Sequence, residues 1–271
     1  MSAKSWDARI ARAGELAAKF SFATELLNFY ASVARLQKEL AAQYVAKSPL
    51  MRRQNFGAAL RHLLEPAALL PQFPRFLSQV AAIAPPPLAA FAGELAGKSA
   101  GVIQQLLAAY WENGCRFEPA LDEPATFCAR AFLQPYAESL ADSIEMPPPS
   151  ISRGSCPLCD GLPQLGVLRP EGDGARRSLL CAFCGVEWEY RRILCPSCGE
   201  EDEKKLCVYA AKEFDYLRVE ACDSCKNYIV TVDLSKDGRA VPFVDELAAL
   251  PVSLWAGEQG YTKIQRNILG M

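Results

Sequence analysis

The chain of 271 residues is long enough for two domains, and with 51% hydrophobic residues it can bury a substantial core. A formal charge of −2 and a pI near 5.7 argue against a nucleic-acid partner, which usually meets a basic protein face. These values also give no support for binding to a membrane surface. Eleven cysteines stand against a single histidine, so sulfur is the expected ligand of any metal ion.

The first twenty residues carry several charged side chains among their alanines, which is unlike a secretory signal. The sequence also lacks a run of about 18 apolar residues, so no membrane insertion is expected. We therefore expect a cytoplasmic protein. Because the cytosol keeps thiols reduced, metal binding or redox catalysis is a better explanation for these cysteines than disulfides.

Residues 1–146 are expected to form an all-α helical bundle, because Ala and Leu recur in them at helical spacing. Two amphipathic stripes begin this region. The pattern of the second lasts only about three heptads, which favours a bundle core over a coiled-coil dimer. The first stripe contains Ile10, Ala13, Leu16, Ala17 and Phe20. The second contains Phe22, Leu26, Phe29, Val33, Leu36, Leu40 and Tyr44.

Four further helices are expected in this region, and the prolines at 85–87 should interrupt the series. The four lie at 56–65 behind a cap at Asn55, at 71–83, at 102–111 behind Ser99, and at 124–140 with a bend at Pro135.

Three side chains of the helical region have ordinary structural explanations. His62 lies among leucines and is expected to be a packed or surface histidine rather than a catalytic one. Cys115 and Cys128 are expected to be small core residues.

Residues 147–155 run Pro-Pro-Pro-Ser-Ile-Ser-Arg-Gly-Ser, and we expect a linker that is stiff at its start and flexible at its end. Short strands and turns follow it. The expected strands are 163–168 and 177–180, which form a hairpin, then 186–190, 205–210, 214–219 and 228–232.

Four Cys-x-x-Cys pairs are the strongest functional signal, because such a pair on a tight turn directs both sulfurs to one point. Pro follows the first cysteine of two pairs, and Gly follows the second cysteine of two, where a left-handed residue is usually needed. The other two pairs have Gly161 and Asn227 nearby, which also tolerate a positive φ. The pairs are Cys156/Cys159, Cys181/Cys184, Cys195/Cys198 and Cys222/Cys225.

Loop lengths favour joining the pairs in sequence order. This gives Cys-x2-Cys-x21-Cys-x2-Cys for the first site and Cys-x2-Cys-x23-Cys-x2-Cys for the second. Both are slightly longer than the usual ribbon spacing of about 15–20 residues. Crossed pairing would entangle the two modules through the ten residues between Cys184 and Cys195.

The fold class is therefore expected to be α+β and multidomain: an all-α bundle followed by two tandem rubredoxin-like or zinc-ribbon metal modules. We place the modules at 156–192 and 193–245, and a C-terminal extension, expected to be helical, at 246–271. Because such ribbons bury little core, metal removal is expected to unfold them and to leave the helical half intact.

Several side chains near the pairs have two interpretations. Six basic residues could offset the negative charge of the thiolates, or they could be solvated strand ends. These are Arg176, Arg177, Arg191, Arg192, Arg218 and Lys226. The acidic residues 200–203 are interpreted as a solvated turn. Cys207 is expected to be buried in a strand, with a spare reactive thiol as the alternative.

The cysteine region resembles the formate dehydrogenase accessory protein family, FdhE. The similarity is strong over the C-terminal half, and it is weak over the N-terminal half, at 9–17 and 26–37. The matching segments are Cys156-Pro157-Leu158-Cys159, Leu179 to Cys184 with Glu187-Trp188 and Arg191-Arg192, Cys195-Pro196-Ser197-Cys198, Glu220 to Cys225 with Tyr228, Pro242 to Ala248 with Val244-Asp245-Glu246-Leu247, and Trp255 to Tyr261.

The resemblance implies a cytoplasmic, non-enzymatic helper in the biogenesis of molybdenum- or tungsten-dependent formate dehydrogenase. It implies contact with the catalytic subunit and rubredoxin-like iron held by all eight paired cysteines, with zinc as the alternative because both metals suit four sulfurs. Redox sensing during maturation is a further hypothesis.

Two other functions stay open from the residues alone. One is a zinc-ribbon nucleic-acid binder, against which the acidic pI weighs. The other is a thiol-based redox or sulfur-handling enzyme, which would have to use Cys115, Cys128 or Cys207. The sequence does not define the oligomeric state.

Overall fold

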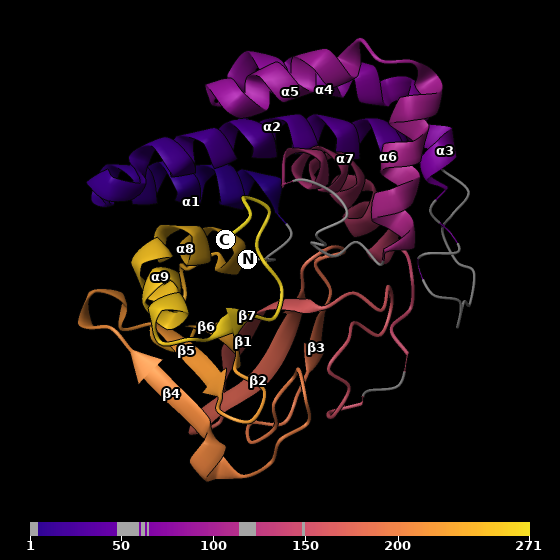
Figure 1. The fold of residues 1–271 in the computed structure, drawn as a ribbon. Coiled ribbons are helices and arrows are strands. Elements are labelled where there is room, and N and C mark those ends of the chain that lie inside the picture. The colour runs from indigo at the N-terminus through magenta and orange to yellow at the C-terminus, as the bar shows by residue number, and fades with distance from the viewer. Residues whose placement is uncertain (1–4, 48–59, 61–62, 64, 114–122, 148–149) are drawn as a thin grey trace.

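The computed structural model describes residues 5–47, 60, 63, 65–113, 123–147 and 150–271, and it shows a helical region above a sheet (Figure 1). The fold class is α+β, as expected. Among the expected features, most of the helix at 56–65 with its cap Asn55, His62 and Cys115 lie outside the described residues.

The helices of the N-terminal region form where the sequence offers starts and apolar spacing. Ser5 caps the first helix, where its side chain accepts a hydrogen bond from the backbone N of Ala8. The bounds are α1 Trp6–Lys19, α2 Thr24–Lys47, α3 Pro66–Leu69, α4 Phe73–Ile83, α5 Pro86–Ala96, α6 Ala100–Glu112 and α7 Glu123–Ala141.

Helix α5 was not expected, because the prolines at 85–87 were interpreted only as a break. Proline is well suited to the first turn of a helix, where its missing N–H has no intrahelical partner, and here it begins one. Among the described residues, no helix combines the length and the apolar character needed to cross a membrane.

Both apolar stripes are buried in part. In the first, Ala13, Leu16 and Ala17 are buried and the other two members are half-buried. In the second, two members are buried and four are half-buried, but Phe22 is 56% exposed and precedes the helix. The buried face of α2 is wider than the stripe, since this helix packs against α1, α4 and α7 at once.

The strands form a single sheet rather than two separate ribbons. Within the described residues the strand order is β3-β2-β1-β6-β5-β4, with β7 beside β6. The bounds are β1 Pro163–Glu171, β2 Gly174–Cys181, β3 Glu187–Glu189, β4 Leu206–Ala210, β5 Leu217–Cys222, β6 Asn227–Asp233 and β7 Thr262–Lys263. Each cysteine module contributes a three-stranded antiparallel meander, and the parallel pairing of β1 with β6 joins the two.

The segment after β6 covers one face of this sheet. Helices α8 (Pro242–Ala248) and α9 (Leu250–Glu258) contact strands β1, β5 and β6, and an apolar core fills the space between them. The extension expected to be helical is therefore helical only in part, because β7 and an irregular tail follow α9.

The end of the linker is held in place rather than flexible. The backbone N of Arg191 donates to the carbonyl of Ile151, and the indole N–H of Trp188 donates to the carbonyl of Arg153 at 2.9 Å. The chain also passes so close to the second module that a Cβ on Gly154 would lie 2.2 Å from the carbonyl oxygen of Pro196. These contacts fix the position of the turn that carries Cys156 and Cys159. Each of the four turns that carry a Cys-x-x-Cys pair is called a knuckle below.

Buried ion pairs join α1 to another helix of the N-terminal region and to the C-terminal region. Arg9 of α1 is 1% exposed and forms two hydrogen bonds with Glu138 of α7, at 3.1 and 3.0 Å. Arg12, one turn further along α1, bonds to the fully buried Asp245 of α8, with a shortest distance of 2.6 Å. Because a buried charge is costly without its partner, these pairs lock α1 to both regions.

Candidate metal centres

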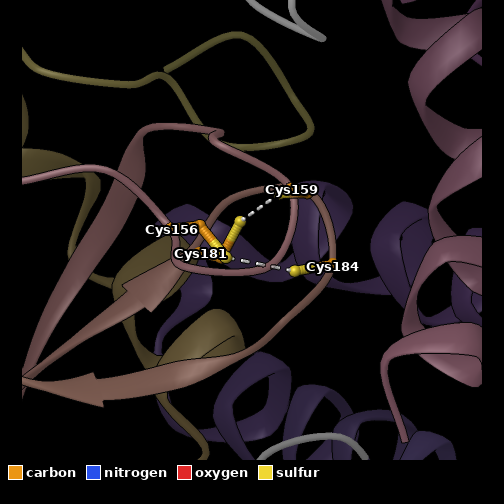
Figure 2. Close-up of side chains that lie close together, drawn as sticks. All are labelled: Cys156, Cys159, Cys181 and Cys184. Carbon is orange, nitrogen blue, oxygen red and sulfur yellow. Dashed lines mark hydrogen bonds between the residues drawn. The ribbon is translucent and has the colours of Figure 1, made fainter. Parts of the chain in front are cut away.

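The eight paired cysteines gather into two quartets, grouped as sequential pairing predicts. One quartet contains Cys156, Cys159, Cys181 and Cys184, and the other contains Cys195, Cys198, Cys222 and Cys225. Within each quartet all sulfur atoms lie within 4.8 Å of one another, and all of these thiols are free. Figure 2 shows the thiols of the first quartet directed toward a common point.

The sulfur spacing fits a tetrahedral metal ion. Metal–sulfur bonds of about 2.3 Å place four tetrahedral sulfurs about 3.8 Å apart. In the second quartet the closest sulfur pairs are 3.8 Å (Cys195–Cys225) and 3.7 Å (Cys198–Cys222) apart. In the first they are 3.5 Å (Cys156–Cys184) and 3.4 Å (Cys159–Cys181) apart. Either quartet could therefore hold one ion.

The residue directly after the second cysteine has a left-handed backbone in all four pairs. These residues are Asp160 (φ 58°), Gly185 (φ 62°), Gly199 (φ 78°) and Lys226 (φ 56°). In two pairs the left-handed residue is thus not the Gly161 or Asn227 that the sequence analysis considered, but the residue before it. The turn requires this conformation at that position whatever residue occupies it, and a non-glycine residue there bears the strain.

Backbone groups are directed toward the sulfurs of the first quartet. The N–H of Gly161 donates to the sulfur of Cys159, and the N–H of Phe183 donates to that of Cys181, both at 3.4 Å. Such donors favour the thiolate form, which is the form that binds metal.

The first quartet is enclosed by the helical region. All four of its cysteines are fully buried and belong to the same apolar core as α1, α2, α6 and α7. The ring of Phe183, inside the second knuckle, makes edge contacts with Tyr110 and Trp111 of α6. The backbone N of Leu60 also donates to the carbonyl of Leu158 at 2.6 Å.

The second quartet lies at the surface. Cys198 is exposed and Cys225 is half-buried, whereas Cys195 and Cys222 are buried. Here polar contacts take the place of the apolar packing that surrounds the first quartet. Glu200 accepts hydrogen bonds from Ser224 and from Lys205, and the side chain of Asn227 donates to Ser197 at 2.8 Å.

The acidic turn at 200–203 is therefore more than a solvated segment. The hydrogen bond from Ser224, aided by the backbone N–H of Asp202 and by Lys205, lowers the pKa of Glu200 to about 2. Glu200 consequently stays ionised at neutral pH and ties one knuckle of the second quartet to the other.

The thiols of the first quartet differ in acidity. Hydrogen bonds with neighbouring thiols raise the pKa of Cys159, and burial raises the pKa of Cys184. Burial also opposes ionisation of Cys181, yet hydrogen bonds from Cys156, Cys159 and Cys184 hold its pKa well below the ordinary value. Four thiolates packed this closely repel one another, so they need a cation to balance their charge.

The six flanking basic residues bond to carboxylates and carbonyls rather than to sulfur in the described structure. Arg177 and Arg218 both bond to Glu220, each with a nitrogen–oxygen distance of 2.6 Å. Lys226 bonds to Asp223 at 2.6 Å, and Arg191 to Glu201 at 2.8 Å. Arg176 lies 3.8 Å from Glu171, and Arg192 donates to the carbonyl of Ala175. Arg177 is the buried member of this group, and its bond to Glu220 joins β2 to β5, whereas Arg176, Arg191 and Lys226 form exposed pairs.

Two cysteines outside the quartets take different positions. Cys128 is fully buried in α7, as expected of a core residue. Cys207 is only half-buried, because β4 lies at the sheet edge, and its thiol donates to Asp223 at 3.4 Å.

The sequence analysis did not predict the buried charged residues that pack beside the first quartet. Glu138, the partner of Arg9, lies so close to the second knuckle that a Cβ on Gly185 would be 3.3 Å from its carboxyl carbon. The sequence does contain a sign of these contacts. Arg9 and Arg12 lie on the face of α1 that also carries the apolar residues Ala13 and Leu16. Two arginines on an apolar face predict buried carboxylate partners, which are here Glu138 and Asp245.

The fold and sites together define a helical protein fused to a pair of four-cysteine ribbons that share one sheet. The sequence model for "FdhE, central domain" matches residues 155–192, and that for "FdhE, C-terminal domain" matches residues 193–269. Over residues 155–269 the chain is therefore similar to the FdhE family throughout.

Related proteins extend this similarity. An FdhE homologue of Aquifex aeolicus (strain VF5) is 33% identical over 170 residues, which cover 62% of this chain and 58% of that protein. One of Pseudomonas aeruginosa is 35% identical over 126 residues, which cover 44% of this chain and 40% of that protein. The aligned regions thus span only about half the length of these relatives.

A solved structure shows that the whole fold is shared. The crystal structure of the FdhE protein from Pseudomonas aeruginosa matches this structure with a TM-score of 0.73 and 24% identity, over 99% of this chain and 96% of that one. The helical region, in which the sequence resemblance is weak, is therefore included in the common fold.

Proposed function

We propose that this chain is a non-enzymatic accessory factor for the biogenesis of molybdenum- or tungsten-dependent formate dehydrogenase, acting in the cytoplasm by binding the catalytic subunit. The observation that carries the proposal is the presence of two complete four-cysteine quartets within an FdhE fold. The helical region and the exposed parts of the sheet offer the surface for the client protein.

All eight quartet cysteines are proposed metal ligands, with iron as the metal and zinc as the alternative. The sulfur spacing and the N–H groups directed at sulfur support a tetrahedral ion of either kind. Bound iron would supply a reversible one-electron change, and the exposure of Cys198 would let that change respond to the surroundings.

We further propose the division into a helical domain 1–146, a linker 147–155, metal modules 156–192 and 193–245, and an extension 246–271. Helix α8 continues through the last of these boundaries, so the extension begins inside a helix.

The decisive experiment is anaerobic purification followed by metal analysis and by a binding assay with purified formate dehydrogenase catalytic subunit. Two metal ions per chain and a stable complex are expected, and replacing Cys181 or Cys222 by Ser should weaken that complex. Fewer than two ions, or no complex, would contradict the proposal. A salt-dependent shift of DNA or RNA would instead favour a zinc-ribbon nucleic-acid binder.

A further inference from the structure

An apolar groove lies where the edge strand β4 meets α9 and the turn that joins α1 to α2. Its volume is about 780 Å³, and aromatic side chains form much of its wall. Prominent among the lining residues are Phe20, Phe22, Tyr209, Phe214, Pro251 and Trp255. Phe22 is 56% exposed, which is a large open area for a phenylalanine in a folded protein.

The groove reaches the free edge of the strand. Val208, Tyr209 and Ala210 all line it. The Tyr209 ring packs beside Trp255 in the groove, so the side chains of Val208 and Ala210 point to the other face and these two residues border the groove through their backbone. The groove therefore lies against the backbone of the last strand in the described sheet order.

This edge has no protection against pairing with another strand. Strand β4 ends the sheet order, and its five residues, Leu-Cys-Val-Tyr-Ala, include neither a charged residue nor a proline. Natural proteins usually shield an edge with such residues or with a very short strand. The opposite edge follows that rule, because β3 has only three residues and two are glutamates.

We propose that β4 binds an extended apolar segment of the client protein as an added strand, with alternate side chains of that segment filling the groove. The backbone of the segment would pair with the outer edge of β4 over about 17 Å, the length of five strand residues. Among the lining residues, Glu213 alone is charged, so the segment should be neutral or basic at that position. The inference rests on the proposed function for the source of the segment.

A second copy of the chain fits this surface less well. Edge-to-edge pairing of two β4 strands would direct the second copy's Cys207 and Tyr209 to the groove side. Tyr209 is already engaged, since its ring lies 4.8 Å from that of Trp255 and its hydroxyl contacts that of Tyr261. The aromatic groove would then stay largely unfilled.

The test compares two lysine substitutions at residues of similar exposure. Phe22 lines the groove and is 56% exposed, and Leu254 of α9 does not line it and is 58% exposed. Phe22→Lys should weaken binding of the purified formate dehydrogenase catalytic subunit by about tenfold or more, as expected for a central interface position. Leu254→Lys should leave it unchanged. Equal binding by the wild type and Phe22→Lys would overturn the proposal and leave the proposed function standing.

A peptide probe tests the groove independently of that client. The probe is a fluorescent Lys-Val-Thr-Phe-Thr-Val-Lys peptide, and its control is the same peptide N-methylated at alternate residues, which removes backbone donors. Binding of the probe, loss of binding on N-methylation and loss in Phe22→Lys would support strand addition even if the catalytic subunit did not bind. In that case the proposed function alone would fail.

Two results would overturn strand addition. One is binding of neither the probe nor the catalytic subunit by the wild-type chain. The other is a wild-type dimer, seen by sedimentation, that Phe22→Lys converts to a monomer, because the groove would then be occupied by a second copy.

Discussion

The two cysteine quartets share their ligand spacing and their left-handed turns, but they lie in opposite environments. The first is fully buried in the core that the helices form, and the second has one exposed and one half-buried cysteine. The comparison teaches that spacing defines which side chains can bind metal, whereas packing defines what a bound metal supports. The first ion would hold two regions together, and the second would be open to solvent.

The largest expected effect is the difference between two single variants, each of which lacks one cysteine ligand of one quartet. Cys159→Ser should unfold most of the chain, because a structural metal contributes about 10–16 kcal/mol, which is comparable to the whole stability of a protein. Cys198→Ser should lose one metal ion but keep its helices. Circular dichroism, limited proteolysis and metal analysis would measure this, and equal loss of helicity in both variants would contradict the comparison.

This expectation revises the one drawn from the sequence. Metal removal was expected to leave the helical half intact, since the ribbons were treated as separate modules. The core of the first quartet is continuous with α6 and α7, so its loss should reach the helices.

The next effect concerns the buried pair beside the first quartet. Glu138→Gln leaves the guanidinium of Arg9 buried without a carboxylate and should cost about 3–5 kcal/mol of unfolding free energy. The matched control is Asp7→Asn, which removes the exposed partner of Lys38 and should cost no more than about 1 kcal/mol. Denaturant unfolding of the metal-loaded protein would measure both. Similar costs would show that the Arg9–Glu138 pair does not anchor α1.

A smaller effect separates the two glycines that follow a second cysteine. Alanine at either position meets a left-handed backbone, which costs about 1–2 kcal/mol. Gly185→Ala should cost more than Gly199→Ala, because its Cβ would press on Glu138, whereas a Cβ on Gly199 has no atom within 4 Å. Thermal unfolding of the two variants would rank them, and the reverse order would be inconsistent with tight packing of the first quartet.

The smallest effect should be confined to the second quartet. Glu200→Gln weakens the bonds to Ser224 and Lys205 that hold its knuckles together. A chromogenic chelator should extract metal in two phases, with the exposed quartet first, and the substitution should speed the first phase only. Acceleration of both phases would show that the two sites are coupled.

The sequence predicted the sites better than the fold around them. The pairs from Cys156 to Cys225 were sufficient to define two quartets, because ligand spacing in such turns is a local property. The strands were also largely foreseen, as with β3, where Trp188 alternates with two glutamates.

Long-range contacts could not be read from local patterns. The parallel pairing of β1 with β6, for example Leu165 opposite Val230, depends on residues far apart in the chain. The different burial of the two quartets likewise depends on where α6 and α7 pack. The predicted stripe of 22–44 failed at Phe22, because this residue lies in the short turn Ser21–Ala23 that precedes α2 and so does not share the buried side of that helix.

The partners of α1 have a consequence for synthesis on the ribosome. Arg12 bonds to a carboxylate 233 positions later, and Arg9 to one 129 positions later. During translation the apolar face of α1 can pack on α2 early, but Arg9 has no carboxylate partner until residue 138 has emerged and Arg12 has none from α8 until residue 245 has emerged. Such distant closure slows folding and exposes a nascent chain to aggregation. A protein proposed to escort another thus has a prolonged vulnerable period of its own, which ends only when α8 reaches α1.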